Sequence, residues 1–357
     1  MDQLPTPKRP RKLMTNSGWT TSREPVAEGG AWKLRQAQGS LIGAIVLGIM
    51  AAFWNGITWT GVIAVWRDEH GLIAIGITVF LSIFVLIGLA LAAAACYLLV
   101  KTLFSPRVEL TVDAPVLTAG KSHAVHWTVT KGQQRLSTLE LSLVLREECQ
   151  YRRGTDTTTE RHEISRHVLA SHSEPGATGR CEVLLPVGAL PSFSTTSNQL
   201  IWILQVCGSV RGLPDVDDEY PLRVVAEAPS VPALVATRLP DDAALEGQDV
   251  LLALAEPELP LAPGQPRAAV VGARTAATLR LRWITSGKGD SRSEVASELD
   301  LPPGCSAVVL TLPPTPPAWR GTILSLTWRL ELATGERTLE QELSIAAPVS
   351  ALVSQHP

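Results

Sequence analysis

Histidine is the residue type in this sequence best suited to bind a metal or move a proton, and five of the seven histidines form two groups. His123 and His126 are three residues apart, and His162, His167 and His172 are spaced by five. Both groups lie in segments that we expect to be β-strands, where residues at odd spacing point to opposite faces. His162 and His172 could share a face but would lie about 33 Å apart on a straight strand. We interpret the histidines as surface or hairpin residues and predict no metal site and no cofactor.

Two acidic runs could in principle hold a cation. One is Glu147-Glu148, and the other comprises Asp215, Asp217, Asp218 and Glu219. We place the second run in a loop that could bind calcium weakly, although its spacing does not fit an EF-hand. Solvated loop charge is the simpler interpretation.

Catalytic signatures are absent from the sequence. It contains no Gly-x-Ser-x-Gly, no Gly-x-x-x-x-Gly-Lys-Ser/Thr, no Gly-x-Gly-x-x-Gly and no His-Glu-x-x-His. We therefore predict that the protein is not an enzyme. The net charge of −3 also argues against a nucleic-acid partner.

The segment Tyr151–Thr159 is the most distinctive polar stretch of the chain. Arg152 and Arg153 precede Gly154 and Asp156, which can form a tight turn, and a run of threonines follows. Two interpretations remain open. The segment is a connecting hairpin, or it is a contact loop in which Arg152, Arg153 and Asp156 engage a partner or lipid headgroups.

Two long stretches lack charged side chains. We expect them to enter a membrane and so to hold the polar segments described above beside it. They run from Leu41 to Trp66 and from Leu72 to Val100, and each exceeds the roughly 20 apolar residues that cross a bilayer as a helix. We predict a transmembrane helical hairpin over residues 41–100, with helices at about 41–66 and 72–100. The lipid bilayer is thus one expected partner.

Basic residues flank the open end of this hairpin. Residues 1–40 carry seven basic and three acidic side chains, and Lys101 and Arg107 follow the second stretch. Because basic residues mark the cytoplasmic side, we expect the N-terminus and the C-terminal region to lie in the cytoplasm, at a bacterial inner (plasma) membrane. Five cysteines without CxxC spacing suit a reducing compartment. We expect residues 1–40 to be a disordered basic tail.

Small residues form stripes on both predicted helices. Close approach of helix backbones needs such residues, and Asn55 needs a polar partner within the span. The stripes either pack the hairpin or dock another membrane protein. The residues are Ala44, Gly48, Ala52, Asn55, Gly56 and Thr60 on the first helix and Gly88 and Ala92 on the second.

From Ser105 onward apolar and polar residues alternate, as in Val108, Leu110 and Val112. Such alternation is typical of antiparallel strands with one buried face. An internal repeat with an offset of 126 residues relates Pro191, Phe193, Trp202 and Val206 to Pro317, Trp319, Trp328 and Leu332. We predict a membrane-anchored, mainly β protein with two tandem antiparallel β-sandwiches, at 105–226 and 227–350.

The repeated units, LPVGALPSFSTTSNQLIWILQV and LPPTPPAWRGTILSLTWRLEL, resemble arrestin-like domains. The whole chain also resembles uncharacterised bacterial membrane proteins that have a two-helix N-terminus and a β-rich cytoplasmic region. The first resemblance implies an arrestin-like fold over about residues 105–350. Arrestins are adaptors that bind other proteins, but their phosphate-sensing residues have no match here, so the resemblance transfers no functional residue.

Two functions remain open at this point. The first is a membrane-tethered, non-enzymatic scaffold or adaptor that binds a protein partner by sandwich loops or a sheet edge. The alternative is a membrane sensor or a toxin-neutralising immunity protein whose transmembrane helices recognise the partner.

Overall fold

The computed structural model describes most of the chain. The described residues are 25–35, 41–68, 71–173, 175–186, 188–195, 197–226, 233–240, 245, 247–261, 264–288, 291–312 and 318–344. Two helices precede a set of antiparallel sheets, which confirms the predicted order of a helical hairpin followed by a β-rich region.

The helices are α1 (Leu41–Asp68) and α2 (Leu72–Phe104). Both are long and apolar enough to cross a membrane, and only 11% of each apolar window is buried inside the structure. A helix in the core of a soluble protein would bury most of its apolar surface. These helices instead expose theirs, so they match a lipid environment in length and composition.

The residues that pack α1 on α2 recur every seven residues. Ala44, Ala51 and Thr58 are buried on α1, as are Gly88 and Ala95 on α2. This spacing is that of coiled-coil packing. The interpretation of the four-residue stripe as the packing surface does not hold for Ala52, Gly56 and Thr60, which are exposed.

Asn55 supplies the polar link within the hairpin. Its Nδ2 donates to the backbone oxygens of Ala51 (2.8 Å) and Gly88 (2.9 Å). Trp54 adds a second interhelical bond, from its indole nitrogen to the Phe84 oxygen at 3.0 Å. The amide of Asn55 therefore has the partner that an apolar environment requires, and Gly88 and Ala92 lie on the packed side of α2 as predicted.

Two sheets form the first sandwich. Sheet I has the order β1-β2-β3-β5-β8 and sheet II the order β11-β10-β6-β7, with β9 beside β10 and a parallel pair β4–β12 at one end. Their apolar faces share one core that includes Leu110, Trp127 and Trp202. The strands are β1 (Val26–Glu28), β2 (Ala31–Lys33), β3 (Arg107–Val112), β4 (Leu117–Thr118), β5 (Ser122–Lys131), β6 (Thr138–Arg153), β7 (Asp156–Ser173), β8 (Thr178–Leu184), β9 (Phe193–Ser194), β10 (Asn198–Gly208), β11 (Val216–Leu222) and β12 (Val224–Val225). A short 3-10 helix, η2 (Gln133–Arg135), follows β5.

Two further sheets form the second sandwich. Sheet III has the order β13-β18-β15-β14, and sheet IV the order β17-β16-β20-β19, with β21 also beside β20. The strands are β13 (Ala233–Arg238), β14 (Val250–Leu254), β15 (Pro266–Ala273), β16 (Ala277–Gly287), β17 (Ser291–Leu301), β18 (Gly304–Thr311), β19 (Trp319–Arg320), β20 (Leu324–Ala333) and β21 (Thr338–Leu343).

The internal repeat marks equivalent places in the two sandwiches. In the first, Phe193 of β9 pairs with Leu200 of β10, and in the second Trp319 of β19 pairs with Leu326 of β20. Both pairs keep the offset of 126 residues. Trp202 and Trp328 are both fully buried at the centre of their strands, so the repeat reflects one strand arrangement used twice. Pro317 lies outside the described residues.

A small hairpin precedes the helices. Strands β1 and β2 pair with each other, and β2 continues sheet I through Trp32 beside Val112 of β3. The expectation of a disordered tail up to residue 40 is wrong for these residues because β3 offers them a free strand edge. Residues 1–24 and 36–40 lie outside the described part.

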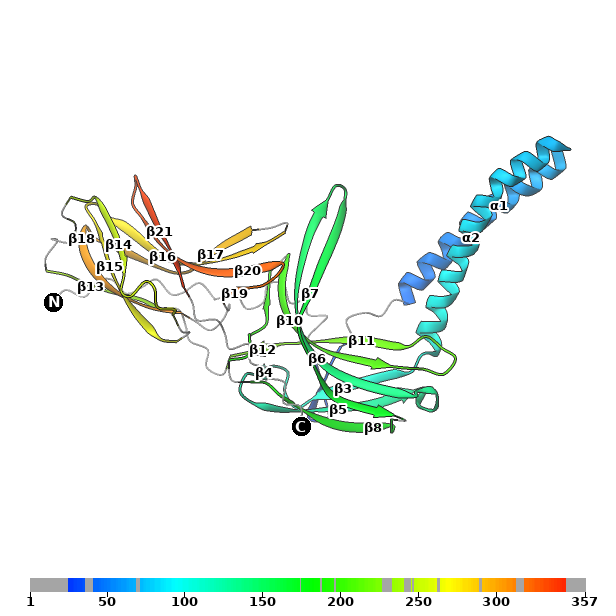
Figure 1. Ribbon diagram of the computed structural model, residues 1–357, viewed down its shortest axis with the longest axis horizontal. Helices are drawn as coiled ribbons and strands as arrows, with labels where there is room; N and C mark the ends of the chain where they lie inside the picture. Colours follow the sequence, from blue (N-terminus) through cyan, green and yellow to red (C-terminus); the bar gives the residue numbers. More distant parts are fainter. Residues whose placement is uncertain are drawn as a thin grey trace.

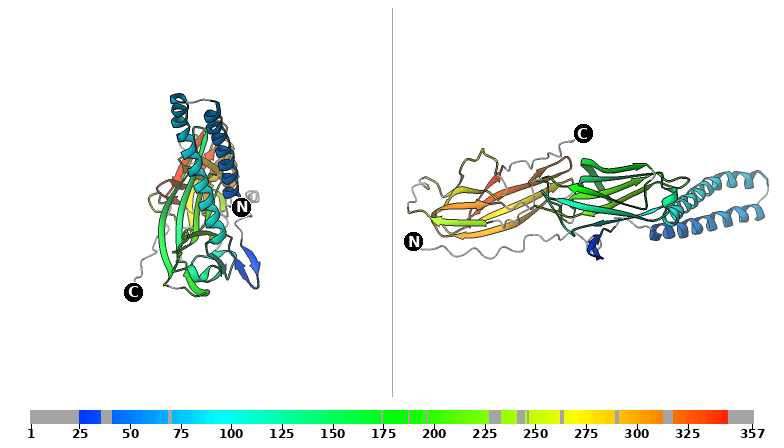
Figure 2. Two further views of the ribbon diagram at one scale, coloured as in Figure 1. Left: turned by 90° about the vertical axis from the view of Figure 1, so that its right-hand side faces the viewer. Right: turned by 90° about the horizontal axis from the view of Figure 1, so that it is seen from below.

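The molecule is elongated (Figures 1 and 2). The helical hairpin lies at one end, the first sandwich in the middle and the second sandwich at the far end. The chain passes from α2 into β3 through Ser105 and Pro106 alone, so the first sandwich adjoins the end of the helices.

Candidate functional site

The hairpin of β6 and β7 extends beyond the rest of sheet II and projects from the molecule (Figure 1). Strand β10 accompanies β6 only as far as the Asn198–Cys149 pair. Tyr151, Arg152 and Arg153 then pair only with Thr158, Thr157 and Asp156 of β7. We call Tyr151–Thr158 the arm. None of its residues is buried, so it adds nothing to the hydrophobic core.

The turn at the tip of the arm is the one that the sequence predicted. Arg153 and Asp156 face each other across Gly154 and Thr155, and Gly154 has a φ of 66°. A two-residue hairpin loop with glycine at a positive φ in its first position matches the right-handed twist of the flanking strands. The structure places Arg152, Arg153 and Asp156 at the exposed tip.

The two arginines do not share a face of the arm, because adjacent residues of a strand point to opposite sides. Arg153 and Asp156 lie on the same side as Tyr151. On this side Glu160, near the base of the arm, contacts the Tyr151 hydroxyl at 3.4 Å and pairs with Lys288 of the second sandwich at 2.6 Å. The arm is thus attached to both sandwiches at its base and is free at its tip.

A buried carboxylate joins the two sandwiches below the arm. Glu147 of β6 is fully buried. Its oxygens accept from the backbone nitrogens of Thr322 (2.7 Å), Ile323 (3.3 Å) and Leu324 (3.2 Å) and from the indole of Trp319 (3.4 Å). Four N–H donors surround the side chain, so it binds as a carboxylate.

The loop that holds Glu147 requires a glycine. A Cβ on Gly321 would lie 2.1 Å from the Glu147 Oε2 atom and 2.3 Å from the Trp319 indole nitrogen. Any side chain at this position would therefore displace the carboxylate. Nothing in the sequence indicates this contact. Both oxygens of Glu147 are occupied by N–H donors and the side chain is fully buried, so the interpretations as a cation ligand and as solvated loop charge are both wrong for this residue.

Three further contacts join the two sandwiches at this junction. The thiol of Cys149, fully buried, donates to the Ile323 oxygen at 3.1 Å, and burial raises the pKa of this thiol. Asn198 of β10 donates to the Thr285 hydroxyl at 3.3 Å. The ring of Phe193 also packs edge-on against Trp283, with centroids 5.5 Å apart. Polar and apolar contacts together hold the sandwiches end to end.

An ion-pair network covers the other side of β6. Arg146 bonds Glu219 at 2.7 Å and Glu148 at 2.7 Å, and Glu148 also pairs with Arg161 at 3.2 Å. Burial lowers the pKa of Arg146, but the bonds to both carboxylates outweigh burial and raise it. The same bond from Arg146 holds the pKa of Glu219 below its ordinary value.

The second acidic run is not the loop that we expected. Asp217, Asp218 and Glu219 lie in β11 (Val216–Leu222), at one edge of sheet II, because Tyr220 and Leu222 enter the core; only Asp215 precedes the strand, in the expected loop. Asp215 bonds the Val210 nitrogen at 3.0 Å and Asp217 bonds Gln205 at 2.8 Å. Among the described residues, no group of three or more His, Cys, Asp or Glu side chains could hold a metal ion.

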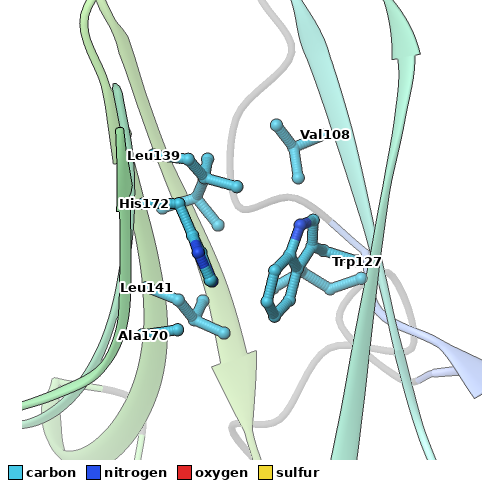
Figure 3. Close-up of a pocket in the computed structure, with 8 residues that line it drawn as sticks. Val108, Trp127, Leu139, Leu141, Ala170 and His172 are labelled. Carbon is cyan, nitrogen blue, oxygen red and sulfur yellow. The ribbon is translucent and has the colours of Figure 1, made fainter. Parts of the chain in front are cut away.

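The histidines have separate surroundings. His123 is buried, contacts Asp113 at 3.1 Å and accepts from the Thr118 nitrogen at 3.0 Å. His172 faces Trp127 at the edge of the first sandwich, with ring centroids 5.3 Å apart (Figure 3). Apolar side chains, Leu139 and Leu141 among them, line the space around these rings. This space belongs to the hydrophobic core.

The outer face of sheet III is exposed and carries no charge over two rows of residues. One row is Val235, Val309 and Ala268, and the next is Thr237, Ala307, Val270 and Ala253. Val235 and Val309 are 56% and 44% exposed. Contiguous exposed apolar surface is typical of protein contact regions.

Fold and site together define a class: an elongated tandem β-sandwich protein with an apolar helical hairpin at one end and a projecting arm between its sandwiches. No family model matches the chain, and no curated protein matches it. Among solved structures the chain is similar to the protein of "Crystal Structure of Squid Arrestin", with 7% identity and a TM-score of 0.35, covering 68% of this chain and 98% of that one. A TM-score of this size carries no argument, so the description of the fold rests on the strand pairing given above.

Proposed function

We propose that this protein is a membrane-tethered, non-enzymatic scaffold that binds a protein partner through the tip of its arm. The helical hairpin enters the bilayer, and the two sandwiches hold the arm away from it. The arm is the observation that supports this proposal. A two-stranded ribbon without buried residues is marginally stable in water, so its retention is best explained by a contact that it makes.

The composition of the tip fits a protein partner. Tyr151 and Arg153 lie on one face, and tyrosine and arginine are enriched among the residues that dominate protein interfaces. Asp156 lies beside them and gives the same face both signs of charge. A partner that offers an acidic side chain to Arg153 and a donor to Asp156 would complement this face.

Co-purification of the full chain in mild detergent tests the proposal. We expect a specific protein to accompany the wild type and to be lost from the double variant Arg152→Glu/Arg153→Glu. The double variant Arg180→Glu/Arg320→Glu is a matched control, because both arginines are exposed, with side chains 60% and 77% accessible, and carry the same charge. Equal recovery of the partner from both double variants would remove the arm from the proposal.

A second candidate function places recognition in the membrane. Ala52, Gly56 and Thr60 form a small-residue stripe that faces away from α2, and such a stripe allows another helix to approach closely. A membrane sensor or a toxin-neutralising immunity protein would use this face. Replacing residues 41–104 with an unrelated helical hairpin separates the two candidates, since a scaffold that uses the arm retains its partner and an intramembrane recogniser loses it.

We also propose that the protein lies in a bacterial inner membrane with its sandwiches in the cytoplasm. The excess of basic residues before α1 and after α2 supports this orientation. Labelling of single cysteines from either side of intact cells tests it. Labelling of the α1–α2 loop and of the sandwiches from the same side would refute the hairpin itself.

A further inference from the structure

Five basic residues gather where the helices meet the first sandwich. They come from three segments that are far apart in the sequence: the end of α2 with the start of β3, the end of β5 with η2, and the loop between β10 and β11. Across residues 101–107, 131–136 and 209–215 the chain has five basic side chains and one acidic one, Asp215. We call the five the collar: Lys101, Arg107, Lys131, Arg135 and Arg211.

Direct contacts hold the three segments together. The Lys131 ammonium donates to the Leu103 oxygen at the end of α2, and the Thr130 hydroxyl donates to the Arg107 oxygen at 3.3 Å. The Arg211 nitrogen donates to the Arg135 oxygen at 2.9 Å. The three segments that carry the collar are therefore held together by the fold, mainly through backbone atoms.

The hydroxyl of Ser105 adds a link from the linker to the β10–β11 loop, since it donates to the Pro214 oxygen at 3.4 Å. The close approach of Gly132 to Pro106 adds another, because a Cβ on Gly132 would lie 3.1 Å from the Pro106 Cα. The sandwich thus packs directly against the linker that follows α2, which holds the collar beside the end of the helix.

Its position beside the end of α2 places the collar at the level of lipid headgroups. Leu103 and Phe104, the last residues of α2, are 47% and 52% exposed, and apolar side chains at a helix end lie at the membrane boundary. Only Ser105 and Pro106 separate Phe104 from Arg107. The headgroup layer is about 5–8 Å thick on each side of the hydrocarbon core, so side chains that adjoin Phe104 fall within it.

We propose that the collar binds the phosphate groups of anionic phospholipids and thereby fixes the angle of the sandwiches to the membrane. This inference rests on the membrane tether of the proposed function but not on the arm. Arg107, Arg135 and Arg211 are exposed, and guanidinium groups bind phosphate oxygens through paired hydrogen bonds. Lys131 is occupied by the end of α2 and contributes its charge, while Lys101 lies one turn deeper and can extend toward the headgroups.

Spin-labelled lipids measure this preference in the full chain reconstituted into bilayers of equal phosphatidylglycerol and phosphatidylcholine. We expect wild type to restrict the motion of labelled phosphatidylglycerol more than that of labelled phosphatidylcholine. Each basic residue near an anionic surface contributes about fivefold in association. The preference should fall as salt rises from about 0.05 M to about 0.5 M, since the Debye length shortens.

Three variants make the test specific. Arg107→Glu/Arg135→Glu/Arg211→Glu should abolish the preference, and Arg107→Lys/Arg135→Lys/Arg211→Lys should keep most of it. The control Arg180→Glu/Arg274→Glu/Arg320→Glu carries the same charge change on exposed arginines elsewhere and should behave as wild type. The Lys variant and the salt series keep the test valid if the Glu variant does not fold.

Two outcomes would overturn the proposal. One is equal association of the two lipids with wild type, which would also be the result if the collar served an acidic protein. The other is a preference that survives the charge reversal in a folded variant, which would assign lipid binding to other residues. Loss of the arm's partner in the Arg152→Glu/Arg153→Glu variant, or its retention, leaves these lipid measurements unchanged, so the two proposals fail separately.

Discussion

Glu147 is the residue whose replacement should most directly separate the two sandwiches. The variant Glu147→Gln keeps the size of the side chain but turns one oxygen into an NH₂ group. Whichever way the amide turns, its NH₂ then faces two of the N–H donors that now bind the carboxylate. Hydrogen bonds to a charged group contribute about 1.5–3 kcal/mol each. Loss of two of these hydrogen bonds, partly offset because water enters the loop, should destabilise the closed junction by about 3 kcal/mol.

Cys149 reports on this change because its thiol is buried at the same junction. Alkylation of the thiol requires the junction to open, and in the regime where closing is faster than alkylation the rate follows the opening equilibrium. A cost of about 3 kcal/mol therefore predicts an alkylation rate about 100-fold above wild type. Peptide mass spectrometry measures the rate at each cysteine of the full chain in mild detergent.

Two comparisons make the result interpretable. Cys305 is fully buried inside the second sandwich, so its rate should not change if only the junction opens. Glu148→Gln removes a neighbouring carboxylate whose ion pairs, with Arg146 and Arg161, lie within the first sandwich, and it should leave Cys149 protected. An unchanged Cys149 rate in Glu147→Gln would refute the role of this carboxylate, and a parallel rise at Cys305 would indicate global unfolding instead.

Two further predictions concern the helical hairpin and the pH dependence of stability. In Gly88→Ala the new Cβ would lie 2.5 Å from the Asn55 Oδ1 atom, whereas a Cβ on Gly56 meets nothing within 4 Å. Gly88→Ala should thus destabilise the hairpin by about 1–2 kcal/mol in detergent titrations and Gly56→Ala should not; equal effects would contradict the packing described. Because Arg146 lowers the pKa of Glu219 from 4.5, Glu219 stabilises the fold above that pH, and the contribution is lost as the pH falls through the lowered value. Thermal unfolding should show that Glu219→Gln lowers the free energy of unfolding by about 1–2 kcal/mol near pH 7. In strong acid the variant and wild type should be equally stable. A difference in stability that is the same at all pH values would show that the ion pair is not the cause of that difference.

Much of the fold followed from periodicity along the chain. Charge-free stretches predicted the helices, and the alternation of apolar residues predicted the strands, because both patterns depend on neighbours a few residues away. The offset of 126 residues predicted equivalent strands in two sandwiches, and the pairing of Phe193 with Leu200 and of Trp319 with Leu326 bears this out.

The helix stripe shows where a local pattern misleads. A spacing of four residues turns by about 40° at each step on a helix of 3.6 residues per turn. Ala44 and Gly48 therefore face α2, but Ala52, Gly56 and Thr60 rotate away from it. The packed positions instead recur every seven residues, as in Ala44, Ala51 and Thr58, and small residues alone do not distinguish this spacing from one of four.

Local patterns along the chain specify two apolar helices, a succession of alternating strands and a polar hairpin with Arg152, Arg153 and Asp156 at its tip, because each feature depends on residues close together in the chain. The contact of Glu147 with Trp319, 172 residues away, arises only when the sheets pack together. The same is true of the basic collar, which three distant segments form. The physical reason is that Glu147 is bound mainly by backbone N–H groups. Every residue except proline carries such a group, so the partner of this carboxylate leaves no mark in the sequence.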